Sequence, residues 1–113
     1  MRRAERSARG GDGLLVFGST LFAGLYNGGI KVWNATTWAL ERTLEGHSGG
    51  VAALAMCGDA LASGSFDNTI KIWSTTTWAC ERTLEGHDDS LTALVSSRDN
   101  LISGADDGTI KIW

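Results

Sequence analysis

The sequence predicts an all-β fold made of tandem repeats, and two observations support this prediction. The phrase Gly-Ile-Lys-Val-Trp at residues 29–33 returns as Thr-Ile-Lys-Ile-Trp at residues 69–73 and 109–113, each time 40 residues later. Short apolar or β-branched runs alternate with turn residues about every 8–12 positions, and no stretch has the 3.6-residue period of a helix. A fixed period of this length is typical of proteins whose repeats stack on a shared core. The duplication is extensive, because residues 28–67 and 68–107 align without gaps and are identical at 21 of 40 positions.

Four strands are predicted within one repeat. Residues 51–56 and 60–65 are apolar runs, and residues 69–73 are rich in β-branched side chains. Residues 78–84 alternate between apolar and polar side chains and carry charges, which suits the edge of a sheet. We therefore expect each repeat to form a four-stranded antiparallel sheet. Its first three strands should be covered on both faces, and its last strand should be outermost.

Composition limits the classes of function. The 113-residue chain has a basic leader at residues 1–11, which we interpret as disordered or eroded, followed by an acidic body. An acidic body argues against nucleic-acid binding, which needs clustered Lys and Arg. No apolar run approaches the roughly 20 residues that span a bilayer, so no membrane segment is predicted. The two cysteines, Cys57 and Cys80, lack a metal or redox spacing, so we expect reduced thiols in a cytoplasmic or nuclear protein.

The spacing of a few polar and aromatic residues resembles that of the WD-repeat β-propeller family. A Gly-His pair is followed by a Ser, by an Asp 20 residues after the His, and by a Trp six residues after the Asp. This pattern occurs twice, at Gly46, His47, Ser63, Asp67 and Trp73 and at Gly86, His87, Ser103, Asp107 and Trp113. The Trp-Asp ending of the family is replaced here by Trp-Asn at residues 33–34 and by Trp-Ser at residues 73–74.

The resemblance implies a partial β-propeller of about three four-stranded antiparallel blades, the last one lacking its outer strand. Residues 12–46 correspond to a degenerate blade, residues 47–86 to a complete blade and residues 87–113 to a truncated blade. The first copy departs from the pattern at the His, Ser and Asp positions, where it has Ser7, Ala23 and Asn27. We therefore expect the first blade to be the least stable.

The resemblance also implies a buried hydrogen-bond chain in each later blade. One chain would run from Trp73 through Ser63 and His47 to Asp67, and the other from Trp113 through Ser103 and His87 to Asp107. The chemistry agrees, because Trp only donates, Ser relays, His donates and accepts, and a carboxylate only accepts. These residues are therefore predicted to stabilise the blades.

A Ser, a His and an Asp also suggest a hydrolytic triad. However, the set recurs in each later repeat, and the sequence contains no Gly-x-Ser-x-Gly motif. His47 and His87 belong to different blades, which disfavours a shared metal site. We therefore predict a protein that is not an enzyme and that uses neither a metal nor a cofactor.

In proteins of this family, partners usually bind the narrower end of the propeller, around the central channel. The corresponding positions here are Tyr26, Phe66 and Asp106 before the turns, and Gly50, Ala52, Ser90 and Thr92 near the first strands. Tyr26 and Phe66 are the strongest candidates, because exposed aromatic residues dominate interface energetics. The alternative is that they only cover the channel wall. Trp38 and Trp78, in the turn before the last strand, are interpreted as packing residues.

Two functions remain open. The first is a non-enzymatic scaffold that binds other proteins or peptides through loops held on rigid blades. The alternative is the substrate-recruiting propeller portion of a larger enzyme, such as a ubiquitin ligase or kinase. Propellers typically close with 4–8 blades. About three blades therefore predict either part of a longer propeller, which is the interpretation we favour, or a protomer that completes the propeller by self-association.

Overall fold

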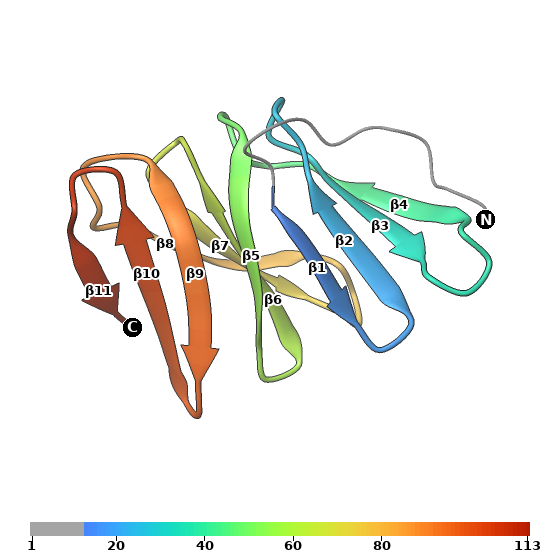
Figure 1. The fold of residues 1–113 in the computed structure, drawn as a ribbon. Helices are drawn as coiled ribbons and strands as arrows, with labels where there is room; N and C mark the ends of the chain where they lie inside the picture. Colours follow the sequence, from blue (N-terminus) through green and yellow to red (C-terminus); the bar gives the residue numbers. More distant parts are fainter. Residues whose placement is uncertain (1–12) are drawn as a thin grey trace.

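Three antiparallel sheets lie side by side in chain order, so the second sheet lies between the first and the third (Figure 1). The computed structural model describes residues 13–113, so the leader at residues 1–11, including Ser7, lies outside the described residues. All regular secondary structure in the described part of the chain is β-strand, as the sequence predicts. A search of residues 13–113 for a helix able to cross a membrane found none.

The sheets contain four, four and three strands in chain order. Sheet 1 comprises β1 (Leu14–Phe17), β2 (Thr20–Gly24), β3 (Ile30–Asn34) and β4 (Leu40–Leu44). Sheet 2 comprises β5 (Val51–Cys57), β6 (Ala60–Ser65), β7 (Ile70–Ser74) and β8 (Cys80–Leu84). Sheet 3 comprises β9 (Leu91–Ser97), β10 (Asn100–Ala105) and β11 (Ile110–Ile112). This arrangement confirms the predicted all-β fold and the three-stranded last sheet.

The outer strand of sheet 2 begins later than the sequence predicts. The prediction places a strand at residues 78–84, whereas β8 begins at Cys80. Trp78 has a φ of 65°, and its backbone N–H donates to the Ser74 carbonyl at 3.0 Å, so it belongs to the preceding turn. Trp38 adopts the same conformation in sheet 1, with a φ of 62° and a 2.7 Å bond to the Asn34 carbonyl.

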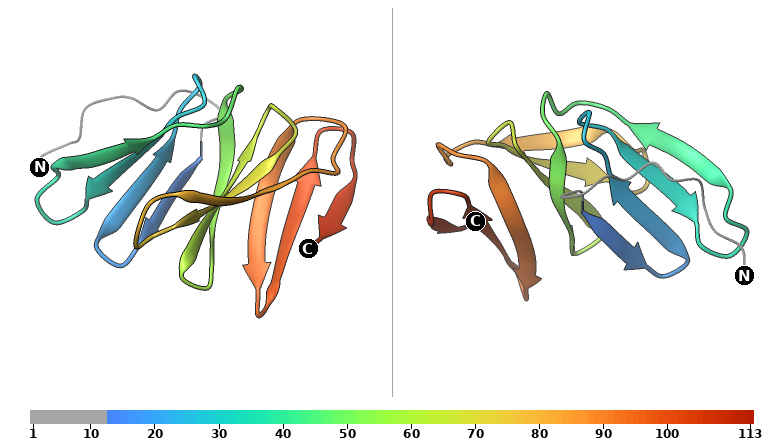
Figure 2. Two further views of the ribbon diagram at one scale, coloured as in Figure 1. Left: turned by 180° about the vertical axis from the view of Figure 1, so that it is seen from behind. Right: turned by 45° about the horizontal axis from the view of Figure 1, so that its top comes forward.

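Two apolar layers join the three sheets. The layer between sheets 1 and 2 includes Phe22, Ile30, Val32, Leu54, Leu61 and Trp73. The layer between sheets 2 and 3 includes Ala55, Ala62, Ile70, Leu91, Leu94 and Leu101. Strand β5 packs against β1 on one side and against β9 on the other, and the views from behind and from above show the same stacking (Figure 2). Sheet 2 is therefore covered on both faces, as predicted.

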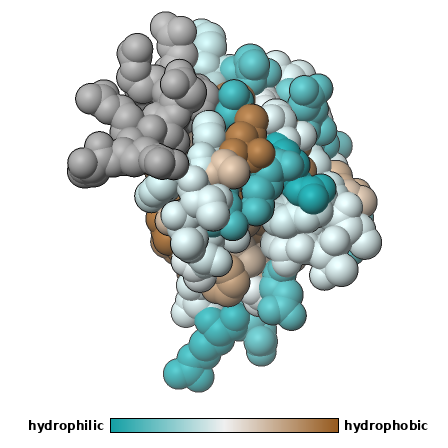
Figure 3. All heavy atoms as spheres, turned by 90° about the vertical axis from the view of Figure 1, so that its right-hand side faces the viewer, coloured by the Kyte–Doolittle hydropathy of each residue, from teal (hydrophilic) through white to brown (hydrophobic). Residues whose placement is uncertain are grey.

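Sheets 1 and 3 depart from the expectation that the first three strands are covered on both faces. Alternate side chains of a strand point to opposite faces, and each end sheet has only one neighbouring sheet within residues 13–113. Sheet 3 consequently exposes Val95, Ile110 and Ile112, while sheet 1 exposes Leu14 and Val16. Figure 3 views the molecule from the end formed by sheet 1 and shows brown hydrophobic side chains among teal hydrophilic ones.

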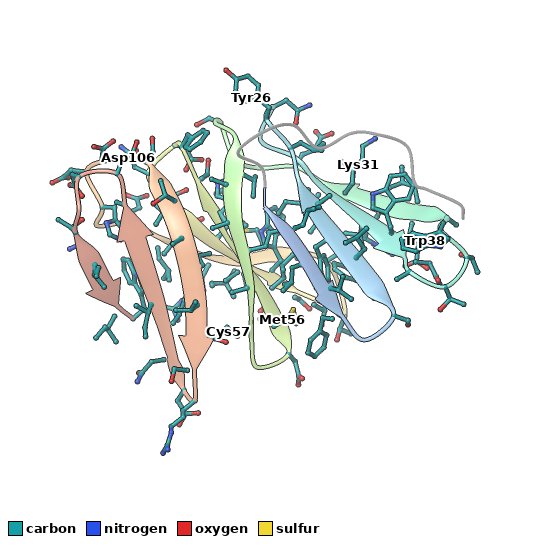
Figure 4. The ribbon with its side chains drawn as sticks, in the orientation of Figure 1. Tyr26, Lys31, Trp38, Met56, Cys57 and Asp106 are labelled. Carbon is teal, nitrogen blue, oxygen red and sulfur yellow. The ribbon has the colours of Figure 1, made fainter. Side chains whose placement is uncertain are left out.

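The turns that follow β2, β6 and β10 lie along one edge of the stack. Each turn holds one of the predicted partner-binding residues, Tyr26, Phe66 or Asp106. Figure 4 shows Tyr26 and Asp106 at this upper edge, while Trp38, Met56 and Cys57 lie lower. Because the repeats have nearly the same length, the sheets bring equivalent positions to the same edge.

Candidate functional site

A buried hydrogen-bond chain connects three parts of sheet 2. The indole Nε1–H of Trp73 on β7 donates to Ser63 Oγ on β6 at 2.9 Å. Ser63 Oγ lies 2.7 Å from His47 Nε2, and His47 Nδ1 lies 2.9 Å from Asp67 Oδ2 in the turn after β6. The structure thus brings together all four residues that the resemblance implies, and it joins the segment before β5 to β6 and β7.

The direction of each hydrogen bond follows from the groups at the two ends of the chain. Asp67 as a carboxylate can only accept, so His47 carries its proton on Nδ1 and donates to Asp67. His47 Nε2 then accepts from the Ser63 hydroxyl, and Ser63 Oγ accepts from Trp73. Ser63 is fully buried and His47 is 6% exposed. Every member of the hydrogen-bond chain is therefore paired while the imidazole is neutral.

Sheet 3 reproduces only part of this chain. Trp113 Nε1–H donates to Ser103 Oγ at 2.8 Å, and Ser103 Oγ lies 2.7 Å from His87 Nε2. The direct bond expected between His87 and Asp107 is absent from this described sheet. Instead, His87 Nδ1 lies 3.2 Å from Thr109 Oγ1, which donates to Asp107 Oδ1 at 2.7 Å. The Thr109 hydroxyl therefore relays between the two residues.

Two threonines take part in the hydrogen-bond chains, a role that the sequence pattern did not predict. Thr69 Oγ1 donates to Asp67 Oδ1 at 2.6 Å and lies 3.4 Å from His47 Nδ1, while Thr109 occupies the equivalent position in sheet 3. The signal was available, because a Thr stands two residues after the turn Asp in both repeats. It was overlooked because a β-branched residue at the start of a strand is explained by strand propensity alone.

Burial and hydrogen bonding shift two pKa values in sheet 2. Burial lowers the pKa of His47 below its usual 6.5, and the opposing effect of Asp67 does not fully compensate. Burial alone would raise the pKa of Asp67, but hydrogen bonds from Thr69 and His47 together lower it from 3.8 to about 2. Both shifts favour a neutral imidazole beside an ionised carboxylate.

Sheet 1 contains the same turn after its second strand as sheet 2 but lacks the hydrogen-bond chain. Ala23 stands at the position of Ser63, so this sheet has no hydroxyl there to accept from Trp33. Asn27 stands at the position of Asp67, and its Oδ1 accepts from the Gly29 backbone N–H at 3.0 Å. Asp67 Oδ1 accepts from the Thr69 backbone N–H at 2.9 Å in the same way. An Asx turn therefore forms in both sheets without requiring the charge of the Asp.

The predicted partner-binding residues other than Gly50 follow the turn edge of the stack as a strip. We call this strip the edge surface, and it comprises Tyr26, Ala52, Phe66, Ser90, Thr92 and Asp106. The backbone N–H of Phe66 donates to the Gly50 carbonyl at 2.9 Å, and that of Asp106 donates to the Ser90 carbonyl at 2.9 Å. The Ser90 hydroxyl donates across the sheets to the Phe66 carbonyl at 3.3 Å. Hydrogen bonds therefore fix the backbone of two of its turns.

Exposure differs along the edge surface. Tyr26 is 66% exposed and Phe66 is 41% exposed, while Asp106 and Thr92 are also exposed. Gly50 is buried, so it underlies the edge surface and does not form part of it. A Cβ atom at Gly50 would lie 3.1 Å from the Tyr26 carbonyl and 3.2 Å from Phe66 Cδ2. Gly50 therefore lets the Tyr26 backbone and the Phe66 ring approach the same point closely.

The Ser, His and Asp of sheet 2 do not have the arrangement of a hydrolytic site. Ser63 is fully buried, and its oxygen already accepts from Trp73 while it donates to His47. A nucleophile must instead reach a substrate carbonyl next to an oxyanion site. Within residues 13–113, no cluster of three or more metal-binding side chains is found.

Comparison with known proteins agrees with this architecture. The family profile described as "WD domain, G-beta repeat" matches residues 38–74 and 78–113. Each matched unit begins near the outer strand of one sheet and ends near the third strand of the next. A search of curated proteins returned no match.

Three solved structures illustrate the similarity. The computationally designed Ika4 protein has 36% identity and a TM-score of 0.80, over 88% of this chain and 62% of that one. A chain of the mitotic checkpoint complex has 30% identity and a TM-score of 0.80, over 85% of this chain and 31% of that one. U3-55K has 25% identity and a TM-score of 0.86, over 98% of this chain and 37% of that one. This chain thus spans less than two thirds of each of these proteins.

The matched family units cover more than half of the sequence, and they include the outer strand of sheet 1 and every strand of sheets 2 and 3. WD40 domains commonly mediate protein interactions and are typically non-catalytic. The chain belongs to the WD40, or G-beta, repeat family.

Proposed function

We propose that the chain is a non-enzymatic protein-interaction module and that it binds its partner through the edge surface. The observation that carries this proposal is the exposure of Tyr26 and Phe66 side by side on turns of neighbouring sheets. Exposed aromatic residues on a rigid framework provide large contact areas with little loss of side-chain entropy. A chain of similar fold occurs in the mitotic checkpoint complex, which supports a role in protein assembly.

The chemistry of the edge surface suggests what the partner presents. The exposed rings of Tyr26 and Phe66 suit contact with an apolar side chain of the partner. The sheet 3 end of the surface is acidic, because Asp106 and Asp88 are both exposed. A protein segment with an apolar anchor followed by a Lys or Arg therefore fits this surface best.

Site-specific photo-crosslinking tests the location of the binding surface. A photoreactive phenylalanine analogue is placed at position 26 or 66, and a matched analogue is placed at Phe17. Phe17 is 52% exposed but lies at the opposite edge of the stack. We expect positions 26 and 66 to crosslink to the same partner and position 17 to give no crosslink to it. Crosslinks confined to position 17 would place the binding surface elsewhere.

Affinity measurements then test which side chains matter. The double variant Tyr26→Ala/Phe66→Ala should weaken binding of the crosslinked partner by about 30-fold or more, because a hot-spot residue contributes about 2 kcal/mol. Phe17→Ala serves as the control and should leave affinity unchanged. Gly50→Val should also weaken binding, because its side chain would displace the Tyr26 backbone or the Phe66 ring. Equal affinity for the double variant and the parent would rule out this surface.

A further inference from the structure

Asn27 is the one asparagine of the sequence that a glycine follows, whereas Asn34, Asn68 and Asn100 precede residues with larger side chains. An Asn loses ammonia when the backbone nitrogen of the next residue attacks its side-chain amide carbon. A side chain on that next residue hinders the attack, and Gly28 has none. Asn27 is also exposed, so water reaches its amide. The pair Asn27-Gly28 therefore has the composition of a deamidation site.

The packing of sheet 1 requires the glycine of this pair. Gly28 has a φ of 98°, in the left-handed region that favours glycine. A Cβ atom at this position would also clash with the His47 carbonyl, in the segment that leads into sheet 2. Asn68 occupies the equivalent position in sheet 2, where a side chain is accommodated. The close approach to His47 thus retains a reactive pair in the turn of sheet 1.

The turn places the reacting groups near each other. Asn27 Oδ1 accepts from the Gly29 backbone N–H at 3.0 Å, so the side-chain carbonyl is folded back along the Gly28 peptide. The Gly28 N–H donates to the Leu25 carbonyl at 3.1 Å, and this bond must open before the nitrogen can attack. Sheet 1 lacks the complete hydrogen-bond chain that ties the equivalent turn of sheet 2, because Ala23 replaces the Ser. Local opening should therefore cost less free energy in sheet 1.

We propose that Asn27 is a site of spontaneous deamidation, which adds a carboxylate beside the edge surface. The Gly28 nitrogen loses its proton to a base in solution and forms a bond to Asn27 Cγ, and the amide nitrogen leaves as ammonia. Water then opens the resulting cyclic imide at either carbonyl, which gives an aspartate or an isoaspartate at position 27. Either product carries a negative charge that Asn27 lacks, and that charge lies next to Tyr26.

The fold accepts the aspartate product. Asp67 Oδ1 accepts from the Thr69 backbone N–H at 2.9 Å, as Asn27 Oδ1 does from Gly29, so a carboxylate supports the same turn. An aspartate at position 27 would give sheet 1 the residue type that sheets 2 and 3 have at Asp67 and Asp107. The isoaspartate product instead lengthens the backbone by one methylene group, which should disturb the turn.

Peptide mapping by mass spectrometry tests the proposed reaction. The folded protein is incubated at neutral and at mildly alkaline pH, and a second sample is unfolded in urea. In the folded protein, Asn27 should convert several-fold faster than the other three asparagines. Conversion should be faster at alkaline pH, because the attacking nitrogen must lose its proton. Intact Asn27 in the folded protein after full conversion in urea would overturn the proposal.

Asn100 and a serine variant provide the controls. Asn100 is exposed but precedes Leu101, so equal conversion of Asn100 and Asn27 would show that the glycine is not the cause. Asn27→Ser keeps a side-chain oxygen for the Gly29 N–H but has no amide to lose. On isoelectric focusing, the aged parent should acquire a more acidic species that aged Asn27→Ser does not form. The same acidic species in both would place the reaction at another residue.

Asn27→Asp shows what the aspartate product does. It should comigrate with the acidic species of the aged parent and melt close to the temperature of the parent. Loss of its strands by circular dichroism would contradict our inference that the fold accepts the product.

The effect on binding rests on the proposed function of the edge surface. Asn27→Asp should bind the crosslinked partner more tightly at low salt, by up to about fivefold, because an exposed carboxylate attracts the proposed Lys or Arg weakly. High salt should remove this difference. Equal affinity at low salt, with weakened binding by Tyr26→Ala/Phe66→Ala, would exclude the effect on binding. If the double variant bound normally, the edge surface would be wrong, whereas peptide mapping would still decide whether Asn27 is modified.

Discussion

At the scale of residues, the central feature is a Ser hydroxyl that serves two buried neighbours at once. Ser63 Oγ accepts from Trp73 and donates to His47, and no water is needed to complete either bond. Each bond contributes only about 1 kcal/mol net, whereas a buried group left without a partner costs about 1–3 kcal/mol. Removing the hydroxyl therefore affects two partners, which makes this position more sensitive than a surface Ser.

Ser63→Ala should lower the free energy of unfolding by about 1–3 kcal/mol, because Trp73 Nε1–H and His47 Nε2 both lose their partner. Thermal unfolding followed by circular dichroism measures this change. Ser48→Ala is a suitable control, since Ser48 is exposed and contributes only its backbone N–H to Asp67. Equal melting temperatures for Ser63→Ala and the parent would show that the hydrogen-bond chain does not stabilise sheet 2.

The free energy of unfolding should decrease as the pH falls, first because of the protonation of His47 and then because of the protonation of Asp67. Below pH 6.5 the unfolded chain protonates His47 more readily than the folded chain does, because burial lowers the pKa in the fold. Below about pH 3.8 the unfolded chain also protonates Asp67 more readily, and this contribution is lost as the pH falls toward 2. Both effects reduce the free energy of unfolding.

Melting temperatures measured from pH 7 to pH 3 test this expectation. The parent should lose stability progressively over the range, and His47→Gln should start lower but show a flatter slope between pH 7 and pH 5. A melting temperature of the parent that is constant across the range would contradict the predicted linkage.

The residue scale also shows where sequence reasoning stops. The identities of the four residues in sheet 2 follow from the repeat and the family resemblance, since their side-chain chemistry allows one order of donors and acceptors. The sequence does not indicate that Asp107 is reached through Thr109, because sheets 2 and 3 have the same spacing from His to Asp. A shift of a few tenths of an ångström decides between a direct bond and a relay. Spacing cannot resolve such a difference.

At the scale of elements, the strands agree closely with the prediction from local sequence, whereas the turns differ from it. Apolar and β-branched runs predict the first three strands of a repeat, because strand propensity and burial favour the same residues there. The outer strand is shorter than predicted, since an aromatic residue at position 78 satisfies the strand pattern but adopts a left-handed turn. Its side chain then packs on the neighbouring sheet, a contact that only the tertiary structure supplies.

Gly24 at the end of β2 controls how closely sheets 1 and 2 approach. A Cβ atom at Gly24 would lie 2.7 Å from both Val51 Cγ1 and the Val51 carbonyl, and the backbone contact cannot relax by a side-chain rotation. Gly24→Ala should therefore destabilise the fold by about 1–3 kcal/mol. Gly104→Ala is the matched control in sheet 3, because its nearest neighbour would be Ala93 Cβ at 3.8 Å. Denaturation by urea compares the two, and equal midpoints would argue against close packing at Gly24.

At the scale of the whole molecule, the stack is not uniform. Sheet 2 is covered by apolar layers on both faces, whereas each end sheet is covered on one face. Sheet 1 also lacks the Ser and Asp of the hydrogen-bond chain, and sheet 3 has three strands. The sequence predicts the number and order of these sheets from the repeat period. It predicts the exposure of the end faces poorly, because exposure depends on how many neighbours a sheet has.

Hydrogen exchange should reveal this order of stability. Amides of β6 and β7 in sheet 2 should exchange most slowly, because opening them exposes two apolar layers. Amides of sheet 1 should exchange faster than those of sheet 2, since the hydrogen-bond chain of sheet 1 is incomplete. Mass spectrometry after brief labelling of dilute protein measures the order. Equal protection in sheets 1 and 2 would indicate that the stack opens as one cooperative unit.

The hydrogen-bond chain of sheet 2 closes within that sheet, while the contacts between sheets are mainly apolar. A force that pulls the two ends of the chain apart would therefore act on directional hydrogen bonds within each sheet and on weaker, nondirectional apolar contacts between sheets. In an optical trap, the chain should extend in separate steps, and sheet 2 should unfold last. Sheet 1 or sheet 3 could therefore unfold under force while sheet 2 stays folded, and the exposed face of sheet 2 would remain in place for the lost sheet to refold on.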